Sequence, residues 1–179
     1  MDEIELKFLD INVDEIKEKL EKLGAKLKYD AQTESYPFLA EGFHSSDSNM
    51  KYLRIRQIND DVKITYKDPA KKSYMTTREE IEIRVNNYEK AIKLIEKLGF
   101  EKGKVFRKHR IHYEYGDIHF ELDTLENIPT YLEIETQNEE DMKDICIKLD
   151  LDISNGKKGT IVEILPEMFD NWVKIISKH

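Results

Sequence analysis

Carboxylates and cationic side chains at alternating positions are the residues of this sequence best suited to chemistry. Glu3, Glu5 and Lys7 alternate with apolar residues, so in a strand they share one face. The two-residue spacing recurs in the acidic pairs Glu80/Glu82, Glu121/Asp123 and Glu133/Glu135 and in the basic pairs Arg54/Arg56 and Lys108/Arg110. Lys63 and Lys67, four residues apart, also share one face of a strand. Carboxylates bind hard cations such as Mg²⁺ or Mn²⁺, and Arg and Lys bind phosphate oxygens. Together they indicate a metal-bridged polyphosphate as the ligand.

The elements that must hold these residues are mostly short alternating strands. The pattern predicts strands over 2–9, 26–39, 51–57, 62–67, 76–85, 102–115, 118–124 and 130–137. Amphipathic patterns predict a helix that ends at Gly24 and a second that ends at Gly99, with a third over 139–149 capped by Asn138. A C-terminal helical segment is expected over 160–177, interrupted at Pro166.

The chain contains an internal repeat. Glu-x-Glu followed by a basic residue and then a helix ending in Lys-Leu-Gly occurs twice, beginning at Glu3 and at Glu80. Each helix opens with a capping-box signature, Asn12 with Glu15 and Asn86 with Glu89. No change in composition marks a linker. We therefore expect one domain, 1–179, built from two related parts of about 1–79 and 80–179.

Two arrangements of the strands are compatible with one charged and one apolar face. The first is an open sheet or sandwich whose charged face is solvated. The second is a closed barrel in which the helices cover the apolar faces and the charged faces line a polar tunnel. Ordinary solvent faces mix charges of opposite sign, whereas most neighbouring charges on these strands share a sign. The pattern favours the second arrangement: an α+β fold with a closed eight-stranded antiparallel β-barrel, a charged interior and helices packed on the outside.

Composition excludes several classes of function. The 179 residues carry a net charge of -8, which argues against generic binding to nucleic acid or to an anionic membrane. The single cysteine, Cys146, excludes an intrachain disulfide and fits a reducing interior. No apolar run approaches the roughly 18 residues of a membrane span, and the N-terminus shows no signal-peptide pattern. A cytoplasmic protein is the expectation.

The ordered motifs carry a family resemblance over nearly the whole chain. The N-terminal Glu3-x-Glu5-x-Lys7 resembles the signature of the CYTH superfamily, also called triphosphate tunnel metalloenzymes. The later motifs follow in the family's order: Leu53-Arg54-Ile55-Arg56, Thr65-Tyr66-Lys67-Asp68-Pro69, Glu80-x-Glu82, Lys108-x-Arg110, Phe120-Glu121-Leu122-Asp123 and Leu132-Glu133-Ile134-Glu135. The family includes class IV adenylate cyclases, thiamine triphosphatases, inorganic triphosphatases and fungal RNA triphosphatases.

The resemblance implies a role for each motif. It implies Mg²⁺ or Mn²⁺ as cofactor, held by Glu3, Glu5, Asp123, Glu133 and Glu135. It implies phosphate binding by Lys7, Arg54, Arg56, Lys67, Lys108 and Arg110, with Lys157 or Lys158, preferably Lys158, as a further contact. Glu80 and Glu82 are expected to support the metal, water or basic residues. Glu121 and His112 are expected to contact the ligand-binding residues and not the ligand itself. A carboxylate such as Glu5 or Glu135, or a neutral lysine, would accept a proton, and Glu5, Lys7 and Glu135 are the expected catalytic residues.

Three functions follow from this resemblance. The first is a metal-dependent triphosphatase that hydrolyses inorganic triphosphate, with ATP or other nucleoside triphosphates as further substrates. The alternative is a class IV adenylate cyclase that converts ATP into cyclic AMP and pyrophosphate, and the second alternative is a non-catalytic polyphosphate- or nucleotide-binding module. The expected partner is a triphosphate-containing small molecule, with neither nucleic acid nor membrane, and a homodimer is a further option. The spacing of His44, His109, His119 and His179 suggests no metal site.

Overall fold

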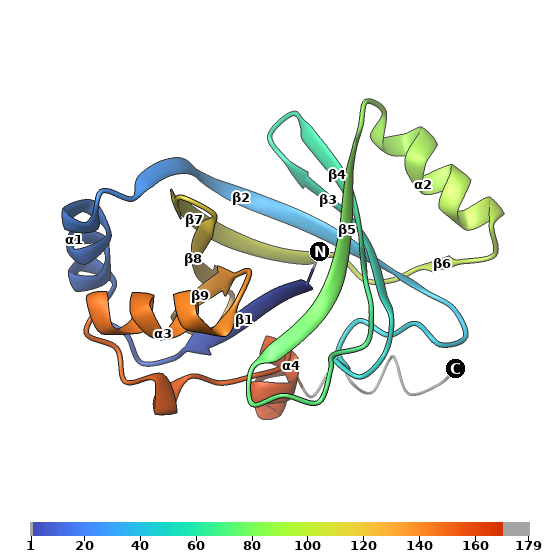
Figure 1. The fold of residues 1–179 in the computed structure, drawn as a ribbon. Coiled ribbons are helices and arrows are strands. Elements are labelled where there is room, and N and C mark those ends of the chain that lie inside the picture. Colours follow the sequence, from blue (N-terminus) through green and yellow to red (C-terminus); the bar gives the residue numbers. More distant parts are fainter. Residues whose placement is uncertain (1, 170–179) are drawn as a thin grey trace.

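Eight antiparallel strands form a closed barrel in the computed structural model, which describes residues 2–169 (Figure 1). The strands are β1 (Asp2–Phe8), β2 (Lys26–Leu39), β3 (Tyr52–Ile58), β4 (Asp61–Lys67), β5 (Thr76–Val85), β7 (Phe106–Tyr115), β8 (Ile118–Leu125) and β9 (Ile128–Thr136). They pair in the order β3-β4-β5-β1-β9-β8-β7-β2, and pairing between β2 and β3 closes the ring. The predicted closed antiparallel barrel is therefore confirmed.

A short ninth strand, β6 (Glu101–Lys102), corrects the prediction of one strand over 102–115. β6 pairs with β2 at Phe38, and β7 resumes the pairing at Ser35. Residues 103–105 thus lie opposite Tyr36 and Pro37 on β2. Pro37 has no N–H to donate. Gly103 donates its N–H to the Pro37 carbonyl at 2.8 Å. A Cβ on Gly103 would meet Pro37 Cγ at 3.0 Å, so this close approach favours glycine.

Turns and helix ends largely follow the predicted signals. Gly116 has φ +58 in the β7–β8 turn, and Asn59 has φ +52 in the β3–β4 turn. Helix α1 (Val13–Leu23) is capped by Asn12, and its C-terminal Gly24 is left-handed. Helix α2 (Tyr88–Lys97) is capped by Asn87 and not by Asn86, because the Asn87 side chain accepts the Lys90 N–H. The predicted cap was therefore wrong by one residue.

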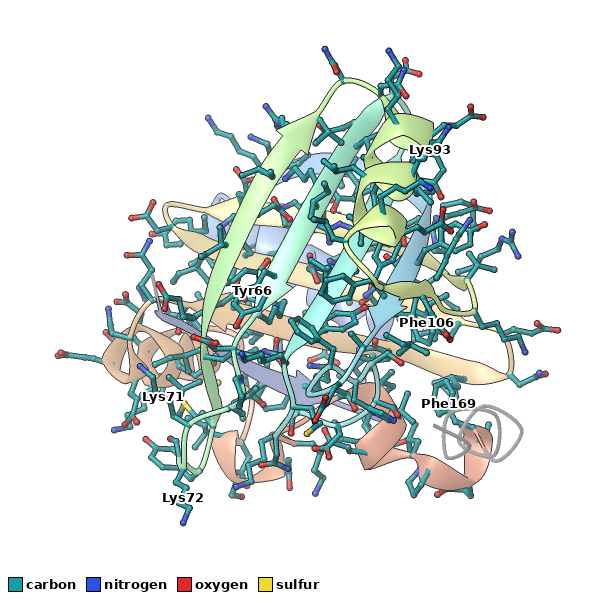
Figure 2. All side chains as sticks on the ribbon, turned by 90° about the vertical axis from the view of Figure 1, so that its right-hand side faces the viewer. Tyr66, Lys71, Lys72, Lys93, Phe106 and Phe169 are labelled. Atoms are coloured by element: carbon teal, nitrogen blue, oxygen red, sulfur yellow. The ribbon has the colours of Figure 1, made fainter. Side chains whose placement is uncertain are left out.

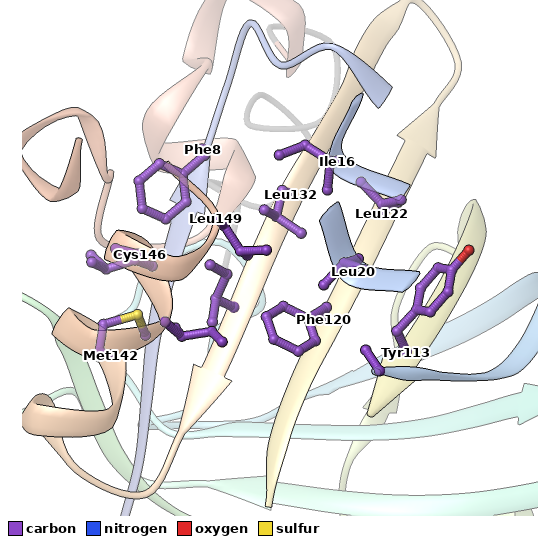
Figure 3. Close-up of a cluster of buried hydrophobic side chains, with 14 of the residues drawn as sticks. Phe8, Ile16, Leu20, Tyr113, Phe120, Leu122, Leu132, Met142, Cys146 and Leu149 are labelled. Atoms are coloured by element: carbon purple, nitrogen blue, oxygen red, sulfur yellow. The ribbon is translucent and has the colours of Figure 1, made fainter. Parts of the chain in front are cut away.

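The main hydrophobic core lies between the barrel and two helices, α1 and α3 (Glu139–Lys148) (Figure 3). Its members come from β1, β7, β8 and β9, from the helices and from residues next to them, and include Phe8, Leu20, Tyr113, Phe120, Leu132, Met142 and Leu149. Cys146 belongs to this core and is buried. Helices therefore cover the apolar faces of these strands, and the charged faces point into the barrel.

Coverage of the barrel is uneven elsewhere. Helix α2 packs over β3 through Ile55, Ala91 and Ile95, whereas Ile81 and Ile83 on the outer face of β5 are 53% and 55% exposed. Figure 2 shows charged side chains such as Lys93 projecting away from the barrel. The helices thus pack on the outside of the barrel as predicted, but they leave these two residues of β5 exposed.

The chain after α3 runs across one end of the barrel. It contains η1 (Ile153–Asn155), the short helix α4 (Ile161–Ile164) and η2 (Pro166–Phe169), so the predicted break at Pro166 is present. The remainder of the predicted 160–177 helical segment lies outside the described residues. No helix in the described part of the chain combines the length and the apolar character needed to cross a membrane.

Candidate active site in the barrel interior

The interior of the barrel holds two adjoining cavities of about 660 and 120 Å³. Four charged residues line both of them: Arg54, Lys67, Glu121 and Glu135. The larger cavity reaches the end of the barrel that carries the β3–β4 and β7–β8 turns, through Asn59 and Asp117. The smaller cavity lies toward the opposite end, where residues of the 44–47 loop and 160–162 also line it. We call these the open end and the closed end.

Acidic side chains from three adjacent strands meet in the barrel. Oxygens of Glu3, Glu5 and Glu135 lie within 4.8 Å of one another, and so do oxygens of Glu121, Glu133 and Glu135. Strand pairing produces this arrangement, because Glu5 lies opposite Glu135, and Glu133 opposite Glu121. Clustered oxygen ligands are what Mg²⁺ and Mn²⁺ prefer. The residues therefore fit a divalent cation.

The protonation of these acids reflects their mutual repulsion. Burial and the neighbouring Glu135 raise the pKa of Glu3 to about 9. Burial and Glu133 likewise raise the pKa of Glu135. Burial also opposes the ionisation of Glu133, but Lys7, Lys108 and Arg110 hold its pKa well below the usual range. A cation among these carboxylates would relieve the repulsion that raises the first two values.

Asp123 is placed differently from the other expected metal ligands. It is fully buried, and both of its oxygens accept bonds from the Arg110 guanidinium at 2.7 Å. The Lys108 ammonium forms an ion pair with the same carboxylate, and the Tyr131 hydroxyl lies 3.4 Å from it. Asp123 belongs to neither acidic group. In this structure its contacts position two cations of the phosphate-binding set.

Arginines on β3 and β5 carry N–H donors without partners. The buried Nε atoms of Arg54, Arg56 and Arg78 make no hydrogen bond within residues 2–169. Buried donors are normally paired, so three unpaired guanidinium N–H groups in one cavity system indicate an anion site. Arg78 was not among the predicted residues. It lies two positions before Glu80 and is therefore on the same face of β5, a signal that the sequence already contained.

The pKa values of the interior lysines are shifted in opposite directions. The Lys7 ammonium lies 2.9 Å from Glu5 and 3.3 Å from Glu133. Although burial disfavours their charge, carboxylates raise the pKa of both Lys7 and Lys67. Lys108 behaves oppositely, because burial and the nearby Arg110 lower its pKa to about 8. A fraction of Lys108 is therefore neutral near neutral pH.

The supporting acids hold the basic residues in place. Glu82 accepts from Lys63 at 2.5 Å, from Arg56 at 3.1 Å and from the Thr65 hydroxyl at 3.1 Å. Glu80 forms an ion pair with Lys67, whose ammonium also lies 3.2 Å from Glu3.

Glu121 forms an ion pair with Arg110, and its carboxylate lies 3.5 Å from His112 Nδ1. Tyr29 stacks on the His112 ring, with the ring centroids 4.9 Å apart. Tyr29 and Tyr131 line the cavities, and neither was among the predicted site residues.

Lys157 and Lys158 are not brought into the cavities. The backbone of Lys157 pairs with that of Lys7 through bonds of 2.8 and 2.9 Å, and both lysine side chains are exposed. The Lys158 ammonium donates to the Ser73 carbonyl at 3.0 Å. The Lys158 side chain thus lies outside the two cavities, and its phosphate contact stays a prediction; the backbone of this segment pairs with the end of β1.

Comparison with known proteins identifies the family. The CYTH domain model matches residues 1–159. A protein of Methanocaldococcus jannaschii, provisionally named an adenylate cyclase, is 34% identical over 137 residues, which cover 75% of this chain and 77% of that protein. The chain belongs to the CYTH family, whose members act on triphosphate substrates.

Solved structures show the same fold. The PH1012 protein of Pyrococcus horikoshii is 32% identical, with a TM-score of 0.71 over 90% of this chain and 98% of that one. A Hippeastrum protein, provisionally named an adenylyl cyclase and described as having a dominant triphosphatase activity, is 17% identical. Its TM-score is 0.60, with 93% of this chain and 95% of that chain covered, and at this identity the likeness shows the fold alone.

Proposed function

We propose that this protein is a divalent-metal-dependent triphosphatase that hydrolyses inorganic triphosphate, and also ATP, inside the barrel. The observation that carries the proposal is the set of unpartnered Nε donors on Arg54, Arg56 and Arg78, which share the cavities with the carboxylate groups. Donors alone would serve any anion. Cations beside clustered carboxylates instead suit an anion that arrives with a metal ion, as triphosphates do.

The carboxylates of Glu3, Glu5 and Glu135 would hold Mg²⁺ or Mn²⁺, with Glu133 as a neighbour. A bound ion neutralises charge on phosphoryl oxygens and polarises them. The phosphate chain would be bound by the interior cations Lys7, Lys67, Lys108, Arg54, Arg56, Arg78 and Arg110. Several of these cations need no reorganisation during the reaction, because acids such as Glu5, Glu80 and Asp123 already fix Lys7, Lys67 and Arg110.

The hydrolytic step requires water to form a bond with a phosphorus atom while the bridging P–O bond to the leaving phosphate breaks. We assign Glu135 as acceptor of the water's proton, because it belongs to both carboxylate groups and would therefore lie beside a water held at the metal ion. Lys7 would neutralise charge on the phosphate, and Glu5 would position Lys7 at 2.9 Å. Lys108, with its pKa of about 8, is the lysine of this interior best placed to accept a proton instead.

Hydrolysis is favoured over cyclisation by the lining of the cavities. The smaller cavity, about 120 Å³, is bordered by Glu5, Lys7, Lys108 and Arg110 and suits phosphates better than a nucleoside. Tyr29, an aromatic residue of the larger cavity, is already stacked on His112. Inorganic triphosphate needs no base-binding surface at all.

A cyclase is the second candidate, and the related M. jannaschii protein's provisional name is what favours it. In that reaction the ribose 3′-hydroxyl would attack the α-phosphorus and pyrophosphate would leave. A non-catalytic polyphosphate-binding module is the third candidate. The carboxylate groups speak against it, because a pure anion binder gains little from them.

Product analysis separates the three candidates. The full chain is incubated with inorganic triphosphate or with ATP, each with Mg²⁺ or Mn²⁺, and the products are resolved by anion-exchange chromatography. Phosphate and pyrophosphate from triphosphate, and ADP and phosphate from ATP, are expected. Cyclic AMP and pyrophosphate from ATP would replace the hydrolase with the cyclase. Stabilisation against heat by triphosphate without turnover of either compound would identify a binding module.

A further inference from the structure

A second group of potential metal ligands lies at the open end of the barrel, apart from the clustered carboxylates. His112 and Glu114 are on β7, and His119 is on β8, directly opposite Glu114. One ligand atom from each of the three lies within 4.8 Å of the other two. Their separation along the chain does not reveal this grouping. The β7–β8 hairpin creates it by turning at Gly116.

The three ligand atoms form a triangle of suitable size for a transition metal. His112 Nε2 lies 3.4 Å from Glu114 Oε1 and 3.4 Å from His119 Nδ1, and His119 Nδ1 lies 3.8 Å from Glu114 Oε1. A tetrahedral zinc ion with bonds of about 2.0–2.1 Å separates its ligand atoms by about 3.3–3.4 Å. A triangle with these edges has a centre roughly 2 Å from each corner, which is a zinc bond length.

We propose that His112, Glu114 and His119 form a Zn²⁺ site, with its remaining coordination position open to the larger cavity. Two imidazoles and one carboxylate are an established zinc ligand set. They also differ in kind from the all-carboxylate groups, which suit hard cations such as Mg²⁺. The chain would therefore bind two classes of metal at two places in one cavity system.

The surroundings of His112 support this assignment. The residue is 7% exposed, and its ring is held against Tyr29 with an interplanar angle of 7°. Its Nδ1 makes no hydrogen bond in the described part of the chain and lies 3.5 Å from Glu121 Oε1. A carboxylate behind the second ring nitrogen is the usual support for a metal-bound histidine, because it fixes the tautomer that leaves Nε2 free to bind.

The other two ligands are also accessible to a metal. Glu114 binds the Lys28 ammonium at 3.0 Å through Oε2, so Oε1 remains for the ion. The His119 side chain is 41% exposed and lines the larger cavity. An ion bound here would have a water or a ligand atom on its open side. Zinc at this position would add positive charge at the open end, beside the larger cavity.

Calorimetric titration of the full chain, without a histidine tag and stripped with chelator, tests the site. Zn²⁺ is added in saturating Mg²⁺, which occupies the carboxylate groups. One equivalent of Zn²⁺ is expected to bind, and His119→Ala should weaken the binding by at least about tenfold. His109→Ala is the matched control, because His109 lies on β7 with His112 and Glu114 but pairs with Asp30. Equal Zn²⁺ affinity in wild type and His119→Ala would overturn the proposal.

Co²⁺ absorption provides a readout that is independent of catalysis. Four-coordinate Co²⁺ bound through imidazole gives strong visible bands, whereas six-coordinate Co²⁺ among carboxylates gives weak ones. Strong bands are expected in wild type and in Glu5→Gln, and their loss is expected in Glu114→Gln. Bands that vanish in Glu5→Gln but persist in Glu114→Gln would place the ion among the carboxylates and refute the site. Failure of triphosphate turnover would leave these results unaffected.

Discussion

Two strands of the barrel carry the same sequence pattern, yet they present it to opposite ends. β1 carries Glu3-x-Glu5-x-Lys7, and β5 carries Glu80-x-Glu82-x-Arg84. Along β1 the exposed fraction of the side chains falls from 26% at Glu3 to 6% at Lys7. Along β5 it rises from 15% at Glu80 to 75% at Arg84. The first motif therefore ends buried at the closed end, whereas the second ends exposed at the open end.

Antiparallel pairing explains the difference. β1 and β5 are neighbours, with Glu3 opposite Arg78 and Glu5 opposite Thr76. The end of β1 and the beginning of β5 therefore meet at the closed end. Arg78, and not Arg84, becomes the β5 cation beside Glu5, with its Nη2 3.6 Å from the carboxylate. A repeated motif thus predicts which side chains share one face of a strand. The position of the strand in the barrel then determines which of those side chains are buried beside the acids.

Removing the last cation of each motif should produce the largest difference between them. Lys7→Met leaves Glu5 and Glu133 buried without their shared ammonium. Breaking a buried pair in this way destabilises a protein by about 3–5 kcal/mol. Arg84→Met breaks an exposed pair with Asp61 and should change the free energy of unfolding by about 0–1 kcal/mol. Urea denaturation of the two variants measures both values, and equal losses would contradict the burial gradient.

Replacing the second glutamate of each motif by glutamine should lower the rate of hydrolysis by different factors. Glu5→Gln removes a carboxylate from the Glu3, Glu5 and Glu135 group, and we expect triphosphate hydrolysis to fall by about 100-fold or more. Glu82→Gln removes a partner of Lys63 and Arg56 near the open end. We expect a loss of only several-fold. Initial rates at saturating Mn²⁺ provide the comparison, with melting curves as a control for folding. A larger loss in Glu82→Gln would place the chemistry at the open end.

Much of this fold could be predicted because the strands repeat one simple pattern. Strict alternation on β1 and β5 fixes which residues face inward, and the apolar faces of β1 and β9 require helices over them. The break between β6 and β7 could not be predicted. It depends on Pro37 of a distant strand, where Gly103 accommodates the close contact.

The candidate site was predictable where it depends on side-chain direction and unpredictable where it depends on pairing. Alternation placed Glu133 and Glu135 inside the barrel, but only the register shows that Asp123 is held by Arg110 and separated from the acidic groups. The path of the chain after α3 turns Lys158 toward Ser73. No local signal in the sequence records that path.

The two motifs should also differ in how their acids couple stability to pH. Burial and Glu135 raise the pKa of Glu3 to about 9. The folded state therefore holds a proton that the unfolded state releases near its ordinary value, so this contribution to stability declines as pH rises from about 4.5 toward 9. Glu82 has the opposite sign. Although burial opposes its ionisation, Lys63 and Arg56 lower its pKa, so its contribution is present above the ordinary value and declines as pH falls below it.

Unfolding free energies measured across pH in chelator test this contrast. Glu3→Gln should flatten the decline on the alkaline side, and Glu82→Gln should flatten the decline on the acid side. The Glu3 effect should be the larger, because its pKa is raised to about 9, far from its ordinary value. Two variants with the same profile would show that the strands do not place their acids in different surroundings.

The helices that follow the two motifs give the smallest and most local comparison. Asn12 caps α1 by accepting the Glu15 N–H at 3.3 Å, and Asn87 caps α2 by accepting the Lys90 N–H at 2.8 Å. Loss of such a cap reduces stability by about 1 kcal/mol. Asn87→Ala should show this loss, whereas Asn86→Ala, one residue outside the cap, should change the free energy of unfolding by less than about 0.5 kcal/mol. The reverse order in urea denaturation would restore Asn86 as the cap and shift the start of α2 by one residue.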